Sequence, residues 1–151
     1  VRVDVVEAVL ALDLPGLLDS DARIQALSAF VDQPAAQALA AANKRCANIL
    51  RQAEGEIGAE LDAARFRHKA EAGLHNAIEA KREAVAENVA RADYTAALAE
   101  LAELREPVDR FFDDVLVMDE DPTIRGNRLA LLTSLHGLFL QTADWARIQV
   151  E

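Results

Sequence analysis

The feature that most constrains the fold of this chain is how rarely helix-breaking residues interrupt its apolar sequence. Only six Gly and four Pro occur in 151 residues, of which 52% are hydrophobic and 5% aromatic. The core must therefore be built from Ala, Leu, Val and Ile, and Ala and Leu are strong helix formers. A chain of this length is typical of one domain. We predict an all-α fold with a single domain over residues 1–151.

Apolar periodicity and capping residues divide the chain into six or seven predicted helices that form one bundle. Pro34 suits the first turn of a helix, and Asp121 followed by Pro122 is a start signal of the same kind. Residues 54–66 contain two glycines and are predicted to form a loop. The predicted helices cover residues 3–12, 19–31, 34–53, 67–91, 93–105, 107–118 and 121–147. Because the chain begins with Val and has no signal-peptide pattern, we expect it to be a fragment of a longer chain.

Charge is distributed unevenly along the sequence. The formal net charge is −10, with 26 Asp and Glu against 16 Lys and Arg. Nevertheless, no carboxylate occurs from Gln33 to Ala53, or from Thr123 to Ala143. These two windows carry five positive charges, so the rest of the chain carries a formal −15. The overall charge argues against a non-specific nucleic-acid binder, but a local basic patch remains effective because physiological salt screens charges beyond about 8 Å.

A helical wheel separates the first window into a core side and a polar side. Lys44, Asn48 and Arg51 fall within about 60° of one another, and Arg45 lies beside them. The opposite arc is formed by Leu39, Ala42, Cys46, Ile49, Leu50 and Ala53. The polar side offers hydrogen-bond donors and amides without carboxylates, which suits RNA. We predict that Lys44, Arg45 and Arg51 project freely from this side and that they bind RNA together with Asn48. Arg125 of the second window, in the first turn of its helix, is expected to reach solvent and to join them. The alternative is a solvated face without a ligand.

Arg128 requires a separate interpretation because it points into the apolar arc of the last predicted helix. A largely buried Arg needs a carboxylate partner. Asp109 and Asp113 are candidates, since they lie four residues apart, beside Val108, Phe112 and Val115 of the preceding helix. We predict a structural ion pair between Arg128 and one of these two residues. Contact of Arg128 with RNA is the alternative.

The chain lacks the common motifs of catalysis and of metal or cofactor binding. No Gly-rich phosphate loop, zinc-ligand spacing or nucleophile motif occurs, and the three histidines are scattered. We therefore expect no catalytic residue, no metal and no cofactor in this chain. Cys46 is the single cysteine, which we interpret as a core residue of a protein from a reducing compartment, the cytoplasm. No run approaches the roughly 18 apolar residues of a membrane span, so we expect no membrane partner.

Three blocks of the sequence resemble a known family. They are AANKRCANIL (41–50), REPVDRFFDDVLVM (105–118) and DPTIRGNRLALLTSLHGLFLQTADWARIQ (121–149). In order and spacing these blocks are similar to the C-terminal end of the beta subunit of the bacterial two-subunit, heterotetrameric glycyl-tRNA synthetase. The resemblance covers nearly the whole chain but is weak between residues 54 and 92. Cys46 stands where we expect an aliphatic residue in that family, which is a conservative departure.

The resemblance implies an all-α anticodon-binding domain similar to that of arginyl-tRNA synthetase. It implies that the chain is part of a glycine–tRNA ligase, in which the ATP and glycine chemistry belongs to the alpha subunit. The implied partners are the anticodon stem-loop of tRNA(Gly) and, through the rest of the chain, the alpha subunit.

The basic window would then face the anticodon, which for glycine ends in two cytosines. Cytosine needs donors for N3 and O2 and a carboxylate or carbonyl for the N4 amino group, and the sequence leaves open which carboxylate serves. The alternative function is a protein–protein docking module that uses the sparsely apolar helix 67–91.

Overall fold

The computed structural model describes residues 2–12 and 17–150. Helices are the regular secondary structure of these residues, which contain no strand, so the predicted all-α fold is confirmed. The α-helices of the described part are α1 (Val3–Leu10), α2 (Leu17–Phe30), α3 (Pro34–Gln52), α4 (Lys69–Ala90), α5 (Tyr94–Ala102), α6 (Arg105–Asp114) and α7 (Pro122–Leu140). Short 3-10 helices occur at Glu54–Glu56, Ala63–Arg65 and Trp145–Arg147.

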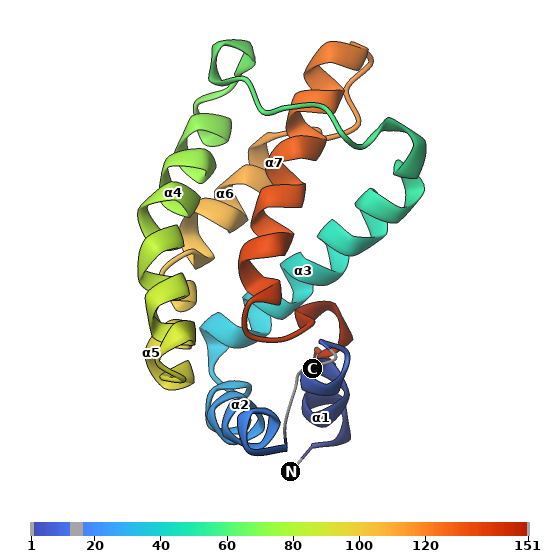
Figure 1. The fold of residues 1–151 in the computed structure, drawn as a ribbon. Helices are drawn as coiled ribbons and strands as arrows, with labels where there is room; N and C mark the ends of the chain where they lie inside the picture. Colours follow the sequence, from blue (N-terminus) through green and yellow to red (C-terminus); the bar gives the residue numbers. More distant parts are fainter. Residues whose placement is uncertain (1, 13–16, 151) are drawn as a thin grey trace.

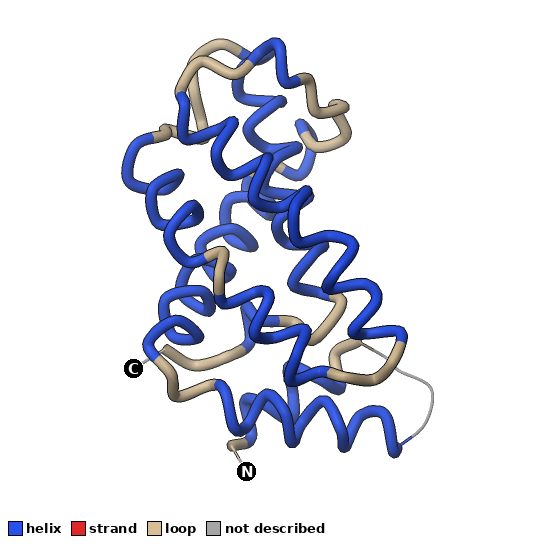
Figure 2. The backbone as a smooth tube through the Cα atoms, turned by 90° about the vertical axis from the view of Figure 1, so that its left-hand side faces the viewer, coloured by secondary structure: helices blue, strands red, loops and turns tan. Residues whose placement is uncertain are grey.

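The body of the molecule is formed by α3, α4, α6 and α7 (Figure 1). α7 packs against both α3 and α4, and α6 packs against the same two helices. α5 lies along α4 and contacts α2, which in turn packs against α1. Figure 2 shows that α2 lies across the lower end of the longer helices. The segment between α3 and α4 crosses over α7 near the opposite end of the bundle (Figure 1).

The shared core is aliphatic, as the composition requires. Its largest fully buried aliphatic side chains are Leu27, Leu39, Leu74, Ile78, Leu98, Leu101, Leu104, Leu129 and Leu131. Fully burying one such side chain contributes about 1.5–3 kcal/mol. Hydrophobic burial between the helices is therefore the main force that sets their relative positions, including the position of α3.

Helix starts follow the sequence signals more closely than helix ends do. Pro34 occupies the first turn of α3, and the Asp121 carboxylate accepts a hydrogen bond from the Thr123 amide at 2.9 Å at the start of α7. By contrast, α5 ends at Ala102, α6 at Asp114 and α7 at Leu140, whereas the predicted ends are residues 105, 118 and 147. An N-cap signal lies in the residues next to the helix start, whereas the position of a helix C-terminus depends on hydrogen-bond partners elsewhere in the fold.

The early end of α7 has such a distant partner. The buried Arg23 of α2 donates through Nη1 to the carbonyl of Gln141 at 2.5 Å and to that of Thr142 at 3.1 Å. A guanidinium at a helix C-terminus satisfies the unpaired carbonyls and favours the negative end of the helix dipole. The predicted continuation to residue 147 is therefore wrong, because a cation 118 residues away caps the helix.

The residues after α7 are held by an aromatic cluster. The Trp145 ring meets Phe139 edge-to-face with centroids 5.2 Å apart, and it meets Phe30 at 6.1 Å. The Trp145 indole Nε1 donates to Thr142 Oγ1 at 3.0 Å, so the polar atom of this buried ring is satisfied. The cluster fixes the last described segment against α2 and α7.

The two ends of the described chain lie next to each other. The Arg2 guanidinium donates to the carbonyl of Gln149 at 2.9 Å, and the Gln149 amide donates to Asp4 Oδ2 at 2.7 Å. The Asp144 amide also donates to the carbonyl of Ala8 at 2.9 Å. The end segments therefore stabilise each other at the lower end of the molecule (Figure 1).

We expect Trp145→Ala to lower the free energy of unfolding by about 3–5 kcal/mol, because it removes a buried ring and leaves a cavity between Phe30 and Phe139. Urea unfolding followed by circular dichroism measures the change. Leu116→Ala is the control, since that side chain is 69% exposed. Equal stability of the two variants would contradict the role given to the aromatic cluster.

Candidate nucleic-acid interface

The exposed side of α3 carries donors and amides but no carboxylate. The opposite side of the helix is buried through Ala36, Leu39, Ala40, Ala42, Asn43 and Cys46. Arg45, Asn48 and Arg51 are exposed, as the helical wheel predicts, and the exposed Gln52 follows at the end of the helix. Packing of α3 against α7 and α6 thus turns this basic strip outward.

Asn48 and Arg51 form a pair on this side. An Nη2 proton of Arg51 is donated to Asn48 Oδ1 at 2.6 Å. The acceptor atom of the amide is thereby used, whereas the Asn48 Nδ2 group makes no hydrogen bond within the described residues. Asn48 therefore presents donor protons outward, held in place by the neighbouring guanidinium.

Arg45 lies towards α6. Its Cζ atom is 4.7 Å from the ring centroid of Phe112, which is the distance of a cation–π contact. The guanidinium is nevertheless exposed, and it forms no ion pair with a carboxylate in the described part of the chain. The ring orients the cation without neutralising it.

Lys44, unlike Arg45, is held by a hydrogen bond within the fold. Its Nζ donates to the carbonyl of Ile148 at 2.6 Å, and the side chain is half-buried. The expectation that Lys44 projects freely from α3 is therefore wrong. The partner lies 104 residues further along the chain, so the helical wheel of α3 contains no signal for this contact.

Arg125 is also engaged within the fold. Its Nη2 lies 2.6 Å from Glu56 Oε1, and its Nη1 donates to the carbonyl of Asp119 at 2.7 Å. The side chain is 20% exposed. The expectation that Arg125 reaches freely into solvent is thus wrong; it ties the segment after α3 to the start of α7. The same segment is held by Asn127, whose amide exchanges two hydrogen bonds with the backbone of Asp62 at 2.7 and 3.0 Å.

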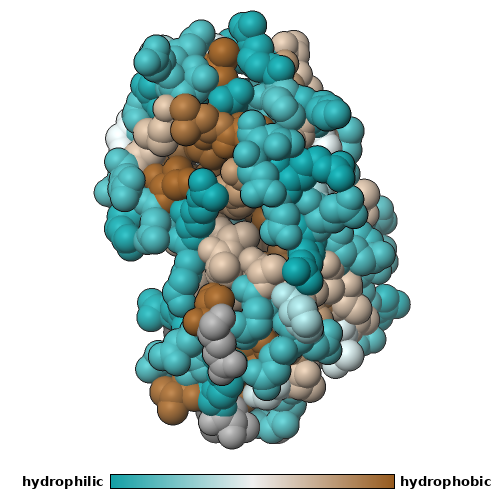
Figure 3. Space-filling view, turned by 180° about the vertical axis from the view of Figure 1, so that it is seen from behind, coloured by the Kyte–Doolittle hydropathy of each residue, from teal (hydrophilic) through white to brown (hydrophobic). Residues whose placement is uncertain are grey.

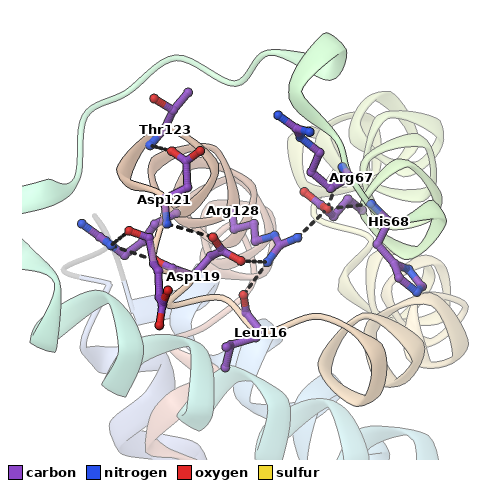
Figure 4. Close-up of polar contacts among 10 residues, drawn as sticks. Arg67, His68, Leu116, Asp119, Asp121, Thr123 and Arg128 are labelled. Carbon is purple, nitrogen blue, oxygen red and sulfur yellow. Dashed lines mark hydrogen bonds and ion pairs between the residues drawn. The ribbon is translucent and has the colours of Figure 1, made fainter.

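Arg128 is buried, as predicted, but its carboxylate partners are different residues. Its Nη2 lies 3.1 Å from Glu71 Oε1, and the two side chains are 8% and 0% exposed. Its Nη1 donates to the carbonyl of Leu116 at 2.6 Å and lies 3.4 Å from Asp119 Oδ2 (Figure 4). We call this group of four residues the Arg128 cluster.

The predicted pairing of Arg128 with Asp113 or Asp109 is therefore wrong. Both aspartates lie on the exposed side of α6, where Asp109 Oδ2 is 3.7 Å from Arg105 Nε. Val108 and Phe111 form the buried side of that helix instead. Spacing along one helix could not reveal that Glu71, 57 residues before Arg128, reaches the same place.

Glu71 has a second role as the capping residue of α4. Its Oε1 accepts from the backbone amides of Arg67 and His68, each at 3.0 Å, while His68 Nδ1 accepts from the Ala70 amide at 3.0 Å. This is a capping box with His in place of the usual Ser or Thr. The sequence signal for this capping box is a Glu three residues after the N-cap. It was missed in the sequence because His68 occupies the N-cap, where Ser or Thr is usual.

The described residues give no support for other kinds of site. No group of three or more His, Cys, Asp or Glu in this part of the chain could hold a metal ion. None of the described helices is long and apolar enough to cross a membrane. Cys46 is buried, as predicted, and its thiol lies 3.3 Å from the carbonyl of Leu132.

The fold and the exposed side of α3 define an all-helical domain with one outward basic strip, and comparison with known proteins gives its family. The family model of the DALR anticodon binding domain matches residues 39–144. The chain belongs to this family. The matched region contains the part of α3 that carries the strip and all four residues of the Arg128 cluster.

Several curated proteins are similar to nearly the whole chain. The "Glycine--tRNA ligase beta subunit" of Ectopseudomonas mendocina is 49% identical over 144 residues, which is 95% of this chain and 21% of that protein. The protein of the same name from Vibrio atlanticus is 47% identical over 147 residues, covering 97% and 21%. That from Haemophilus influenzae strain PittGG is 48% identical over 149 residues, covering 99% and 22%. The chain thus spans about a fifth of the length of these relatives.

We expect Arg128→Ala to lower the free energy of unfolding by about 3–5 kcal/mol, because Glu71 would be left buried without its counter-charge. Denaturant unfolding of Arg128→Ala, Glu71→Ala and the double variant measures the coupling, and the double variant should lose less than the sum. Asp113→Ala is the control and should change stability by less than about 0.5 kcal/mol. A loss at Asp113 as large as that at Arg128 would restore the original pairing.

Cys46 should react with a thiol reagent only when the fold opens. Burial raises the pKa of the Cys46 thiol to about 12 from 9.0, so the folded protein keeps it neutral across the range in which an unfolded thiol ionises. Stability should consequently fall as the pH rises from about 9 towards 12. Labelling with a chromogenic disulfide at pH 8, with and without denaturant, measures the protection. Rapid labelling of the folded chain would show that α3 separates readily from α7.

Proposed function

We propose that this chain is the part of a glycine–tRNA ligase beta subunit that recognises the anticodon stem-loop of tRNA(Gly). The observation that carries the proposal is the carboxylate-free exposed side of α3, with Arg45, Asn48 and Arg51, in a member of an anticodon-binding family. Relatives that are 46–49% identical to the chain over the aligned residues carry the name of that ligase subunit, which supports glycine as the amino acid.

The strip contains the two kinds of group that RNA recognition needs. Arg51 keeps donor protons beyond the one given to Asn48, and a guanidinium matches the geometry of a phosphate. Asn48 presents its Nδ2 protons, which suit the N3 or O2 acceptor of a pyrimidine. Arg51 and Arg45 are therefore assigned mainly to the backbone, and Asn48 to a base edge.

The charge distribution supports one direction of approach for the RNA. A formal −15 is carried outside the two acid-free windows, so most other surfaces repel phosphate. Screening at physiological salt limits this repulsion to about 8 Å, which allows the strip on α3 to attract phosphates locally. A locally basic face on an acidic domain thus favours a specific orientation over general adhesion to nucleic acid.

The remaining assignments concern the complete ligase. We propose that ATP and glycine are bound outside this chain, by a ligase in which the alpha subunit performs the activation. We further propose that the ligase acts in the cytoplasm, where tRNA is aminoacylated for translation. In this arrangement the chain contributes recognition of the tRNA and no catalytic residue.

A docking module is the second candidate, and one observation favours it. Leu116 and Met118, in the segment after α6, are 69% and 41% exposed. Figure 3 shows apolar side chains gathered in the upper half of the back of the molecule, the side on which α6 lies. The helix on which the docking hypothesis was based does not favour it, because α4 packs against α5, α6 and α7.

Replacing Arg45 and Arg51 together with Gln should weaken binding of a glycine anticodon stem-loop and flatten its salt dependence. Each phosphate contact to a single strand contributes about −0.7 to the slope of log affinity against log salt, so the slope should fall in magnitude by roughly 1.4. Fluorescence anisotropy at several salt concentrations, on the chain and on the complete ligase, measures both quantities. Thermal melting should stay nearly unchanged because both side chains are exposed.

The matched control replaces Arg82 and Arg91 with Gln. Arg82 lies on α4 and Arg91 directly follows its last residue; both are exposed, and the change in charge is the same. If this control weakens binding as much as the α3 variant, only the net charge matters. If neither variant changes binding, the strip on α3 is a solvated face and the docking module becomes the better proposal.

A further inference from the structure

A hollow between α3 and α6 brings together groups from both helices. The exposed strip of α3 alone does not offer this combination. It encloses about 370 Å³ and is lined on the α3 side by alanines and Arg45, and on the α6 side by Asp109, Phe112 and Asp113. The small side chains of Ala38, Ala41 and Ala42 keep the α3 wall low. The hollow therefore offers a cation, an aromatic ring and carboxylates around one space.

The cation and the ring form a platform for a flat ligand. The Arg45 guanidinium lies over Phe112, 4.7 Å from the ring centroid, and the ring itself is half-buried. Aromatic rings and guanidinium planes are the groups on which proteins stack unpaired bases. Because packing holds Phe112 against the core, the platform exists before a ligand arrives.

The two carboxylates that line the hollow differ in whether they have an ion-pair partner. Asp109 is 3.7 Å from Arg105, whereas the Asp113 carboxylate has no hydrogen bond or ion pair with any residue that the structure describes. Arg45 likewise has no carboxylate partner there. An unpaired acceptor and an unpaired donor thus border the same space without neutralising each other.

We propose that this hollow binds one unstacked cytosine, whose N4 amino group donates to the Asp113 carboxylate. The ring of the base stacks on the guanidinium plane of Arg45, which lies over Phe112. This inference rests on the proposed function and deepens it, because it assigns the carboxylate that recognises a base of the anticodon. The adjacent strip with Asn48 and Arg51 then holds the rest of the loop.

The same arrangement disfavours uracil. Uracil carries a carbonyl oxygen where cytosine carries the amino group, so two acceptors would face each other without a proton between them. Loss of a hydrogen bond to a charged acceptor, together with this repulsion, corresponds to a discrimination of about tenfold or more. Asp113 is accordingly a specificity residue that contributes little to affinity for the phosphate backbone.

The test compares Asp113→Asn with Asp114→Asn in the complete ligase. Both variants remove one negative charge from neighbouring exposed positions of α6, but only Asp113 lines the hollow. The probes are a glycine anticodon stem-loop and loops in which each of its two cytosines is changed to uracil or guanine. We expect the parent and Asp114→Asn to prefer cytosine at one of these positions by about tenfold, and Asp113→Asn to lose most of that preference.

The outcomes separate this inference from the proposed function. If the parent binds the loop, and Arg45 and Arg51 matter, but Asp113→Asn discriminates like Asp114→Asn, the hollow is not a cytosine site although the domain binds RNA. A preference for guanine over cytosine that depends on Asp113 would overturn the choice of base. If no loop binds the parent ligase, the proposed function itself fails.

Discussion

The buried ion pair between Arg128 and Glu71 is the interaction on which the geometry of this domain depends. Two charges removed from water are tolerated only when each compensates the other. Glu71 Oε2 and Arg128 Nε have no hydrogen-bond partner among the described residues, so the pair relies on the other atoms of these two groups. Glu71 at the start of α4 also caps its own helix, and Arg128 on α7 also holds the carbonyl of Leu116. Because Leu116 follows α6 by two residues, the pair fixes the end of the helix that carries Phe112. The hollow beside α3 therefore depends on charges that lie outside its own lining.

The basic side chains of α3 and those of α7 have different roles in this domain. On α7, both arginines of the acid-free window are consumed by the fold, because Arg125 pairs with Glu56 and Arg128 with Glu71. On α3, two of the three cations remain outward, and only Lys44 is bound to a backbone carbonyl. An absence of carboxylates along a helix thus has two physical origins. It protects a surface for an anion, or it reflects arginines whose partners come from other segments.

Local chemistry was predictable from the sequence, and contacts between distant segments were not. The all-α class, the start of α3 at Pro34 and the exposure of Arg51 follow from propensity, capping and helical periodicity. The partners of Arg128 and Lys44 lie 57 and 104 residues away, so no pattern within one helix could indicate them. The hollow was hidden for the same reason, since its walls come from two helices and its existence depends on how closely they pack.

The adjacency of Arg2 and Gln149 has a consequence for how the described part of the chain opens. The Arg2 guanidinium donates to the carbonyl of Gln149, and the Gln149 amide donates to the Asp4 carboxylate. Neither segment can separate from the body without breaking its contacts with the other. Local opening at this end of the molecule therefore involves α1 and the residues after α7 together, as one cooperative unit.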